Sequence, residues 1–79
     1  MSFSGFVVPA ELDHKVFHPM MPKIFLIEGD LLTKSEDGTW FIQAPGMGIG
    51  KWVLTPEQEA LLKPVQYENV GLSYRIVDG

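Results

Sequence analysis

The chain of 79 residues is long enough for one small domain, residues 1–79, because a second hydrophobic core would leave each domain too small. Its composition, 46% hydrophobic and 20% charged, is too apolar for a disordered tail, and its 8 glycines and 6 prolines would interrupt any coiled coil. The absence of cysteine excludes disulfide scaffolds, cysteine zinc sites and thiol catalysis.

The charge balance argues against nucleic acid and anionic membranes as partners. Ten acidic residues outnumber six basic ones, which are scattered along the chain, and the net charge is −4. Such a chain repels phosphate groups. The N-terminus lacks a signal-peptide pattern, and no apolar run approaches the roughly 20 residues of a membrane span. We therefore expect a cytoplasmic protein.

The first part of the chain predicts a short helix, a connector and a buried strand. Residues 9–17 fit a helix, because a proline suits its first turn and Leu12 and Val16 would share one face. The prolines in residues 18–22 prevent this helix from continuing. Residues 23–27, rich in β-branched and aromatic side chains, fit a strand buried on both faces.

The middle of the chain carries a β-hairpin pattern. Two segments, 31–34 and 39–44, flank residues 35–38, where an Asp-Gly pair permits the positive φ angles of a tight turn. The glycine-rich residues 45–50 are expected to interrupt the sheet, and residues 51–54 to resume it. This region therefore predicts a hairpin followed by a further strand.

The last part of the chain predicts a capped helix and a final strand. Thr55 fits the N-cap position, with a proline at the first helical position and a glutamine at the capping-box position, and Pro64 ends the helix. Residues 70–76 alternate apolar and polar side chains, as in a half-buried strand. Together the elements predict a mainly β, α+β fold: a small antiparallel sheet or partly open barrel of about four to five strands with one or two short helices.

The glycine-rich segment is the most prominent candidate site. It looks like a phosphate-binding loop, but Pro45 and Trp52 stand where such a loop requires a glycine and a hydroxyl-bearing residue. One interpretation is a bulged connection between strands. The other is a partner-binding loop, because solvent exposure would waste Met47 and Ile49, and methionine packs adaptably against partner surfaces.

No catalytic or metal-binding set is complete in the sequence. His14 and His18 have the spacing of two metal ligands on a helix, but neither a third histidine nor a cysteine completes the site. Paired acidic residues fall in the predicted turn or on a helix surface, and no nucleophile elbow is present. We therefore expect no enzyme activity, no cofactor and no metal. Trp40 and Trp52 are expected in the core.

Residues 22–65 resemble the small phage-associated PGDYG domains. The resemblance lies in EGDLL (residues 28–32), a hairpin, KWVLTPE (51–57) and KPV (63–65), with Leu31 where the family usually has an aromatic residue. The resemblance implies a bacteriophage or prophage origin and no catalytic activity, and it carries over no functional residue. Small acidic phage proteins of this kind commonly act by occupying a surface on a host complex.

These arguments predict a non-enzymatic protein-binding module that blocks or modulates a host protein complex, such as an anti-CRISPR or another anti-defence inhibitor. Its expected contact residues are Met20, Met21, Met47 and Ile49, with acidic neighbours steering it to a basic partner. The alternative is a virion or assembly protein that self-associates through a sheet edge or through the same loops.

Overall fold

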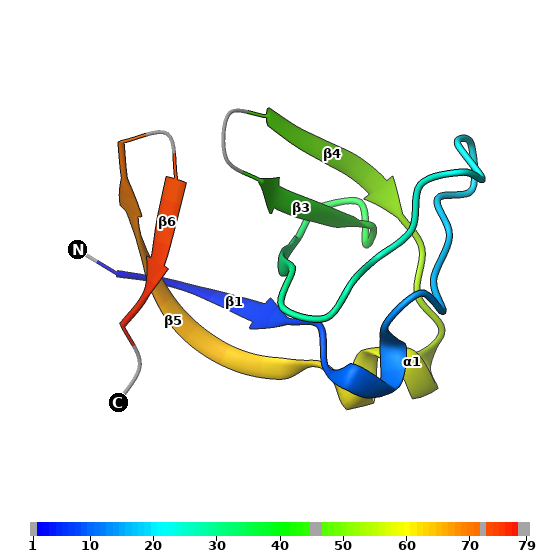
Figure 1. Ribbon diagram of the computed structural model, residues 1–79, viewed down its shortest axis with the longest axis horizontal. Helices are drawn as coiled ribbons and strands as arrows, with labels where there is room; N and C mark the ends of the chain where they lie inside the picture. The colour runs from blue at the N-terminus through cyan, green and yellow to red at the C-terminus, as the bar shows by residue number, and fades with distance from the viewer. Residues whose placement is uncertain (1, 45–46, 72, 78–79) are drawn as a thin grey trace.

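The structure is a computed structural model that describes residues 2–44, 47–71 and 73–77, with the side chains of Ala44 and Met47 excepted. The described residues form a six-stranded antiparallel sheet in the order β4-β3-β2-β1-β5-β6 (Figure 1). The strands are β1 (Phe3–Val7), β2 (Leu31–Lys34), β3 (Trp40–Ala44), β4 (Met47–Trp52), β5 (Lys63–Val70) and β6 (Ser73–Ile76). A 3-10 helix, η1 (Ala10–Leu12), and an α-helix, α1 (Pro56–Leu61), accompany the sheet. The predicted mainly β, α+β class is confirmed, with six strands in place of four to five.

Two strands, β1 and β5, escape sequence prediction because long-range pairing stabilises them. β1 lies in the middle of the sheet and pairs with both β2 and β5. Gly5 weakens its apolar pattern, yet a Cβ atom at Gly5 would lie 3.1 Å from side-chain atoms of both Leu31 and Tyr67. Close packing therefore explains a glycine in a central strand. β5 contains Pro64, a residue that argues against a strand when the sequence is read alone.

The single strand predicted over residues 70–76 is wrong, because this segment belongs to a hairpin. β5 ends at Val70 and β6 begins at Ser73. Gly71, between them, has a φ of 62°, a left-handed conformation that glycine adopts without steric cost. Val70 is 51% exposed and Ile76 42% exposed, so these two residues of the predicted apolar face do not line a buried core.

The helix predicted over residues 9–17 is wrong beyond its first turn, and the strand predicted over 23–27 is also wrong. η1 is the only helical part of the first segment, and His14 has a φ of 60°, which a right-handed helix cannot accommodate. In the second segment, Phe25 forms an isolated bridge with Phe17 and joins no strand of the sheet. The connector predicted between these segments is present. These residues therefore pair locally.

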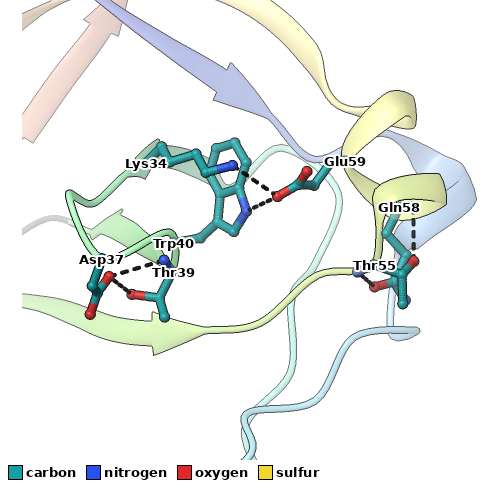
Figure 2. Close-up of polar contacts among 7 residues, drawn as sticks. All are labelled: Lys34, Asp37, Thr39, Trp40, Thr55, Gln58 and Glu59. Atoms are coloured by element: carbon teal, nitrogen blue, oxygen red, sulfur yellow. Dashed lines mark hydrogen bonds and ion pairs between the residues drawn. The ribbon is translucent and has the colours of Figure 1, made fainter.

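The predicted hairpin is confirmed, because β2 and β3 pair antiparallel across the expected turn. The backbone N–H of Ser35 donates to the carbonyl of Thr39 at 2.8 Å, and Gly38 has a φ of 87°. Asp37 accepts hydrogen bonds from the backbone N–H of Thr39 at 3.0 Å and from its hydroxyl at 2.6 Å (Figure 2). The turn chemistry is thus local, which is why the sequence predicts it.

The glycine-rich segment predicted to interrupt the sheet instead forms an edge strand, β4, which pairs with β3. Residues 45–46 lie outside the described part of the chain. Gly48 and Gly50 leave room for the ring of Phe41 on β3. A Cβ atom at Gly50 would lie 3.2 Å from that ring, and one at Gly48 would overlap it. The glycines therefore have a packing role that the sequence pattern alone does not reveal.

The core lies between one face of the sheet, the segment from Val8 to Leu26, and the region around α1. Trp40 and Trp52 are directly opposite each other on β3 and β4, and both are buried as predicted. The other buried core residues are Val8, Leu12, Val16, Leu26, Leu32, Ile42, Leu54 and Leu62. Within the described residues, no helix has the length and apolar character needed to cross a membrane.

The helix α1 begins at the predicted capping box and is fixed to the sheet by a carboxylate. The Thr55 hydroxyl accepts from the N–H of Gln58 at 3.1 Å, and the Gln58 side chain accepts from the N–H of Thr55 at 2.9 Å (Figure 2). Glu59 accepts from Trp40 Nε1 at 2.9 Å and from Lys34 Nζ at 3.2 Å. The hydrogen bond from Trp40, followed by that from Lys34, lowers the pKa of Glu59.

Candidate functional site

The long connection between η1 and β2 forms a lobe, residues 13–28, which extends past the end of β4 at the right of Figure 1. Its two arms hold each other through backbone hydrogen bonds. The N–H of His14 donates to the carbonyl of Leu26, and the N–H of Leu26 donates to that of Val16, both at 2.9 Å. The lobe is therefore a structured ribbon, although it contributes no strand to the sheet.

A carboxylate closes the base of the lobe. Asp13 accepts the backbone N–H of Glu28 at 2.7 Å through one oxygen and contacts His14 Nδ1 at 2.8 Å through the other. The hydrogen bond from Glu28, followed by that from His14, lowers the pKa of Asp13. The charged carboxylate thus joins the beginning of the lobe to its end.

A buried histidine connects the lobe to the sheet. His18 is 3% exposed, and its Nδ1 accepts the backbone N–H of Met20 at 3.1 Å. The proton of the neutral ring is therefore on Nε2, which donates to the carbonyl of Gly50 at 2.8 Å. The ring also packs edge-on against Trp52, with centroids 5.0 Å apart. Both nitrogens have backbone partners, so His18 serves as a structural link.

The histidine pair considered as metal ligands is divided between two environments. His18 is buried, whereas His14 is exposed and bonded to Asp13. The part of the chain that the structure describes contains no group of three or more histidine and acidic residues arranged to hold a metal ion.

The outer face of the lobe presents aromatic and methionine side chains. The centroid of the His14 ring lies 4.4 Å from that of the Phe25 ring, and the centroid of the Phe17 ring lies 5.7 Å from it. Phe17 is 53% exposed, and the following turn presents Met20 at 79% and Met21 at 40% exposure. We call these five residues the lobe surface. It contains two of the four predicted contact residues.

The other two predicted contact residues lie on β4, away from the tip of the lobe. Ile49 is half-buried and packs against the core. It is therefore not the solvent-exposed apolar residue that the partner-binding interpretation assumes. Its carbonyl also accepts the indole N–H of Trp52 at 3.1 Å. The side chain of Met47 lies outside the described part of the structure. Of the three predicted contact residues whose side chains the structure describes, Met20 and Met21 lie on the lobe surface and Ile49 packs against the core.

The sequence patterns do not single out the exposed Phe17 or the half-buried Phe25 that it contacts. Alternation carried a usable signal, because Val16 and His18 are buried while Phe17, between them, points outward. The predicted helix over residues 9–17 conceals this signal, because alternate residues of a helix do not share a face.

A concave region lies on β1 and β5. It is a shallow depression of about 420 Å³, lined by Ser4, Gly5, Phe6, Pro64, Val65 and Gln66. Gln66 donates to the hydroxyl of Ser4 at 2.9 Å, and no lining side chain is charged. The depression therefore offers no acid, base or cation for chemistry.

Comparison with known proteins adds no family assignment. No protein-family model, no curated protein and no solved structure matches the chain. The resemblance to PGDYG domains, and the phage origin that it implies, therefore stay predictions.

Proposed function

We propose that the protein is a non-enzymatic protein-binding module and that the lobe surface is its contact region. The observation that carries the proposal is the exposure of Phe17, Met20 and Met21 on one short segment. Exposed apolar side chains that lie together commonly mark an interaction site, whereas single ones are ordinary. Aromatic side chains are also prominent among the residues that dominate binding energy.

The attachment of the lobe to the rest of the protein supports this role. Asp13 closes its base, and His18 fixes it to β4. A surface held in place before binding loses less conformational entropy when a partner docks. The same contacts explain how apolar side chains can stay exposed without collapsing onto the core.

The biological form of the proposal is an inhibitor or modulator of a host complex, encoded by a phage or prophage and acting in the host cytoplasm. This form depends on the resemblance described above. It requires no catalytic residue, since occupation of a surface is sufficient to block a complex.

The test is quantitative co-purification from the source host. Tagged wild-type protein, a Phe17→Ser/Met20→Ser variant and a Val70→Ser control would be compared by mass spectrometry. Val70 is also an exposed apolar residue, at 51%, but it lies on the β5–β6 hairpin. The proposal predicts a stoichiometric partner that the control retains and the lobe variant loses. Retention by all three proteins would refute it.

Self-association is a second candidate, because the sheet is open and β4 and β6 are its edge strands. Unpaired edges can add strands from another copy. Light scattering of the purified protein across a concentration series distinguishes the two functions. A defined homo-oligomer without a foreign partner would favour a virion or assembly role.

A further inference from the structure

Between the two acidic residues at its base, Asp13 and Glu28, the lobe differs in charge from the rest of the chain. Residues 14–27 contain Lys15 and Lys23 and no aspartate or glutamate, so lysine contributes a charge of +2 there. The remaining residues contain the other four basic residues and all ten acidic ones, a balance of 4 − 10 = −6. Both lysines are exposed. The apolar lobe surface therefore lies on a segment in which two lysines are the only lysine, arginine, aspartate or glutamate residues.

These two lysines are available to a partner. Lys34, Lys51 and Arg75 pair with carboxylates elsewhere on the sheet. Among the ion pairs between described residues, none includes Lys15 or Lys23.

The two carboxylates that flank the segment belong to its base. Both oxygens of Asp13 are engaged, one by the backbone of Glu28 and the other by His14. Glu28 follows the second arm, where the chain returns toward β2. Neither carboxylate belongs to the tip, which Met20 and Met21 form.

We propose that the lobe surface binds an acidic protein segment whose apolar residues pack on Phe17 and the methionines while its carboxylates approach Lys15 and Lys23. This inference rests on the proposed function and specifies the class of partner. It reverses the basic partner expected from the net charge of the whole chain. Because the remainder of the protein repels an acidic partner, the charge distribution favours approach through the lobe.

A single-stranded nucleic acid would also find aromatic rings and cations on this surface, but the observations favour protein. Nucleic-acid grooves use several cations along the backbone, whereas this lobe has two lysines and no arginine. The surrounding charge of −6 would repel the phosphates that extend beyond the lobe.

The test uses a random-peptide display library selected on the intact, immobilised protein. The inference predicts enrichment of peptides that combine acidic and apolar residues. Their affinity should fall roughly tenfold or more for Lys15→Glu/Lys23→Glu, because both attractive charges become repulsive. A Lys63→Glu/Arg75→Glu control makes the same change in net charge on β5 and β6 and should have a much smaller effect.

The Phe17→Ser/Met20→Ser variant separates failure of the inference from failure of the proposed function. Selected peptides without an acidic preference, lost by this variant but unaffected by lysine reversal, would overturn the inference and leave the binding function standing. Selected peptides that bind the Phe17→Ser/Met20→Ser variant as well as the wild-type protein would overturn both the inference and the proposed binding function. A selection that enriches no peptide would also overturn both. A fluorescent oligothymidylate could bind more tightly than any selected peptide and lose this binding on lysine reversal. That result would assign the lobe to nucleic acid and overturn the inference.

Discussion

Replacement of Gly48 by alanine tests whether the glycine-rich strand exists to accommodate Phe41. The added Cβ atom would overlap the tip of the Phe41 ring, which belongs to the neighbouring strand. Gly48 has no positive φ, so the alanine itself imposes no backbone strain. The ring must therefore swing out of its position, or β4 must move.

The expected cost follows from this overlap. Forcing an extra methyl group into a packed contact costs about 1–3 kcal/mol, and an off-rotamer ring about 0.5–1.5 kcal/mol. Because the ring is half-buried and its tip can move, we expect the lower part of this range, about 1–2 kcal/mol. In a Phe41→Ala background the obstacle is absent, and Gly48→Ala should stabilise the strand by about 0.5 kcal/mol.

The assay is a double-mutant cycle measured by urea denaturation of the four proteins. We expect a coupling free energy of about 2 kcal/mol between the two positions, with a sign change for Gly48→Ala between backgrounds. Gly50→Ala is a matched control, since its Cβ atom would lie 3.2 Å from the ring and require a smaller shift. Equal effects of Gly48→Ala in both backgrounds would refute the packing explanation and restore the interpretation of this segment as a glycine-permitted connector.

Three further substitutions test other parts of the structure. Burial raises the pKa of Asp30 above its ordinary 3.8, so its charged form destabilises the folded state at neutral pH. Asp30→Asn retains an acceptor for the N–H of Ile27 and should raise the free energy of unfolding at neutral pH. This gain should disappear below pH 3.8, where Asp30 is protonated in both the folded and the unfolded state. A series of urea titrations at different pH values measures it. Thr55→Ala should cost about 1 kcal/mol and lower Tm by about 4–8 °C in calorimetry, because it removes the N-cap acceptor. His18→Leu should cost about 2–4 kcal/mol and abolish the hydrogen-exchange protection of the Met20 amide, because both backbone partners of the ring lose their bonds. Unchanged protection at Met20 would show that His18 does not hold the lobe.

Locally encoded elements could be predicted from the sequence. The hairpin turn at Gly38 and the capping box at Thr55 depend on residues within a few positions of one another. The burial of Trp40 and Trp52 followed from alternation along strands.

The errors arose where distant residues decide the structure. In the sequence, Gly5 suggests a break in β1, but in the structure the side chains of Leu31 and Tyr67 pack beside it. Likewise, Gly48 suggests a loop, but in the structure the ring of Phe41 packs against it. A pattern confined to one segment contains neither neighbour. The same limit explains why half of the predicted contact set, Met20 and Met21, lies on the lobe surface, whereas Ile49 packs against the core.

The most direct test of the central claim measures stability and binding on one variant, Phe17→Ser. Phe17 is 53% exposed and its ring contacts that of Phe25, so we expect the free energy of unfolding to fall by only about 0.5–1.5 kcal/mol. Capture of the partner identified by co-purification should nevertheless fall strongly. A larger loss of stability with capture of the partner unchanged would show that Phe17 supports the fold, and that the lobe surface is not the binding site.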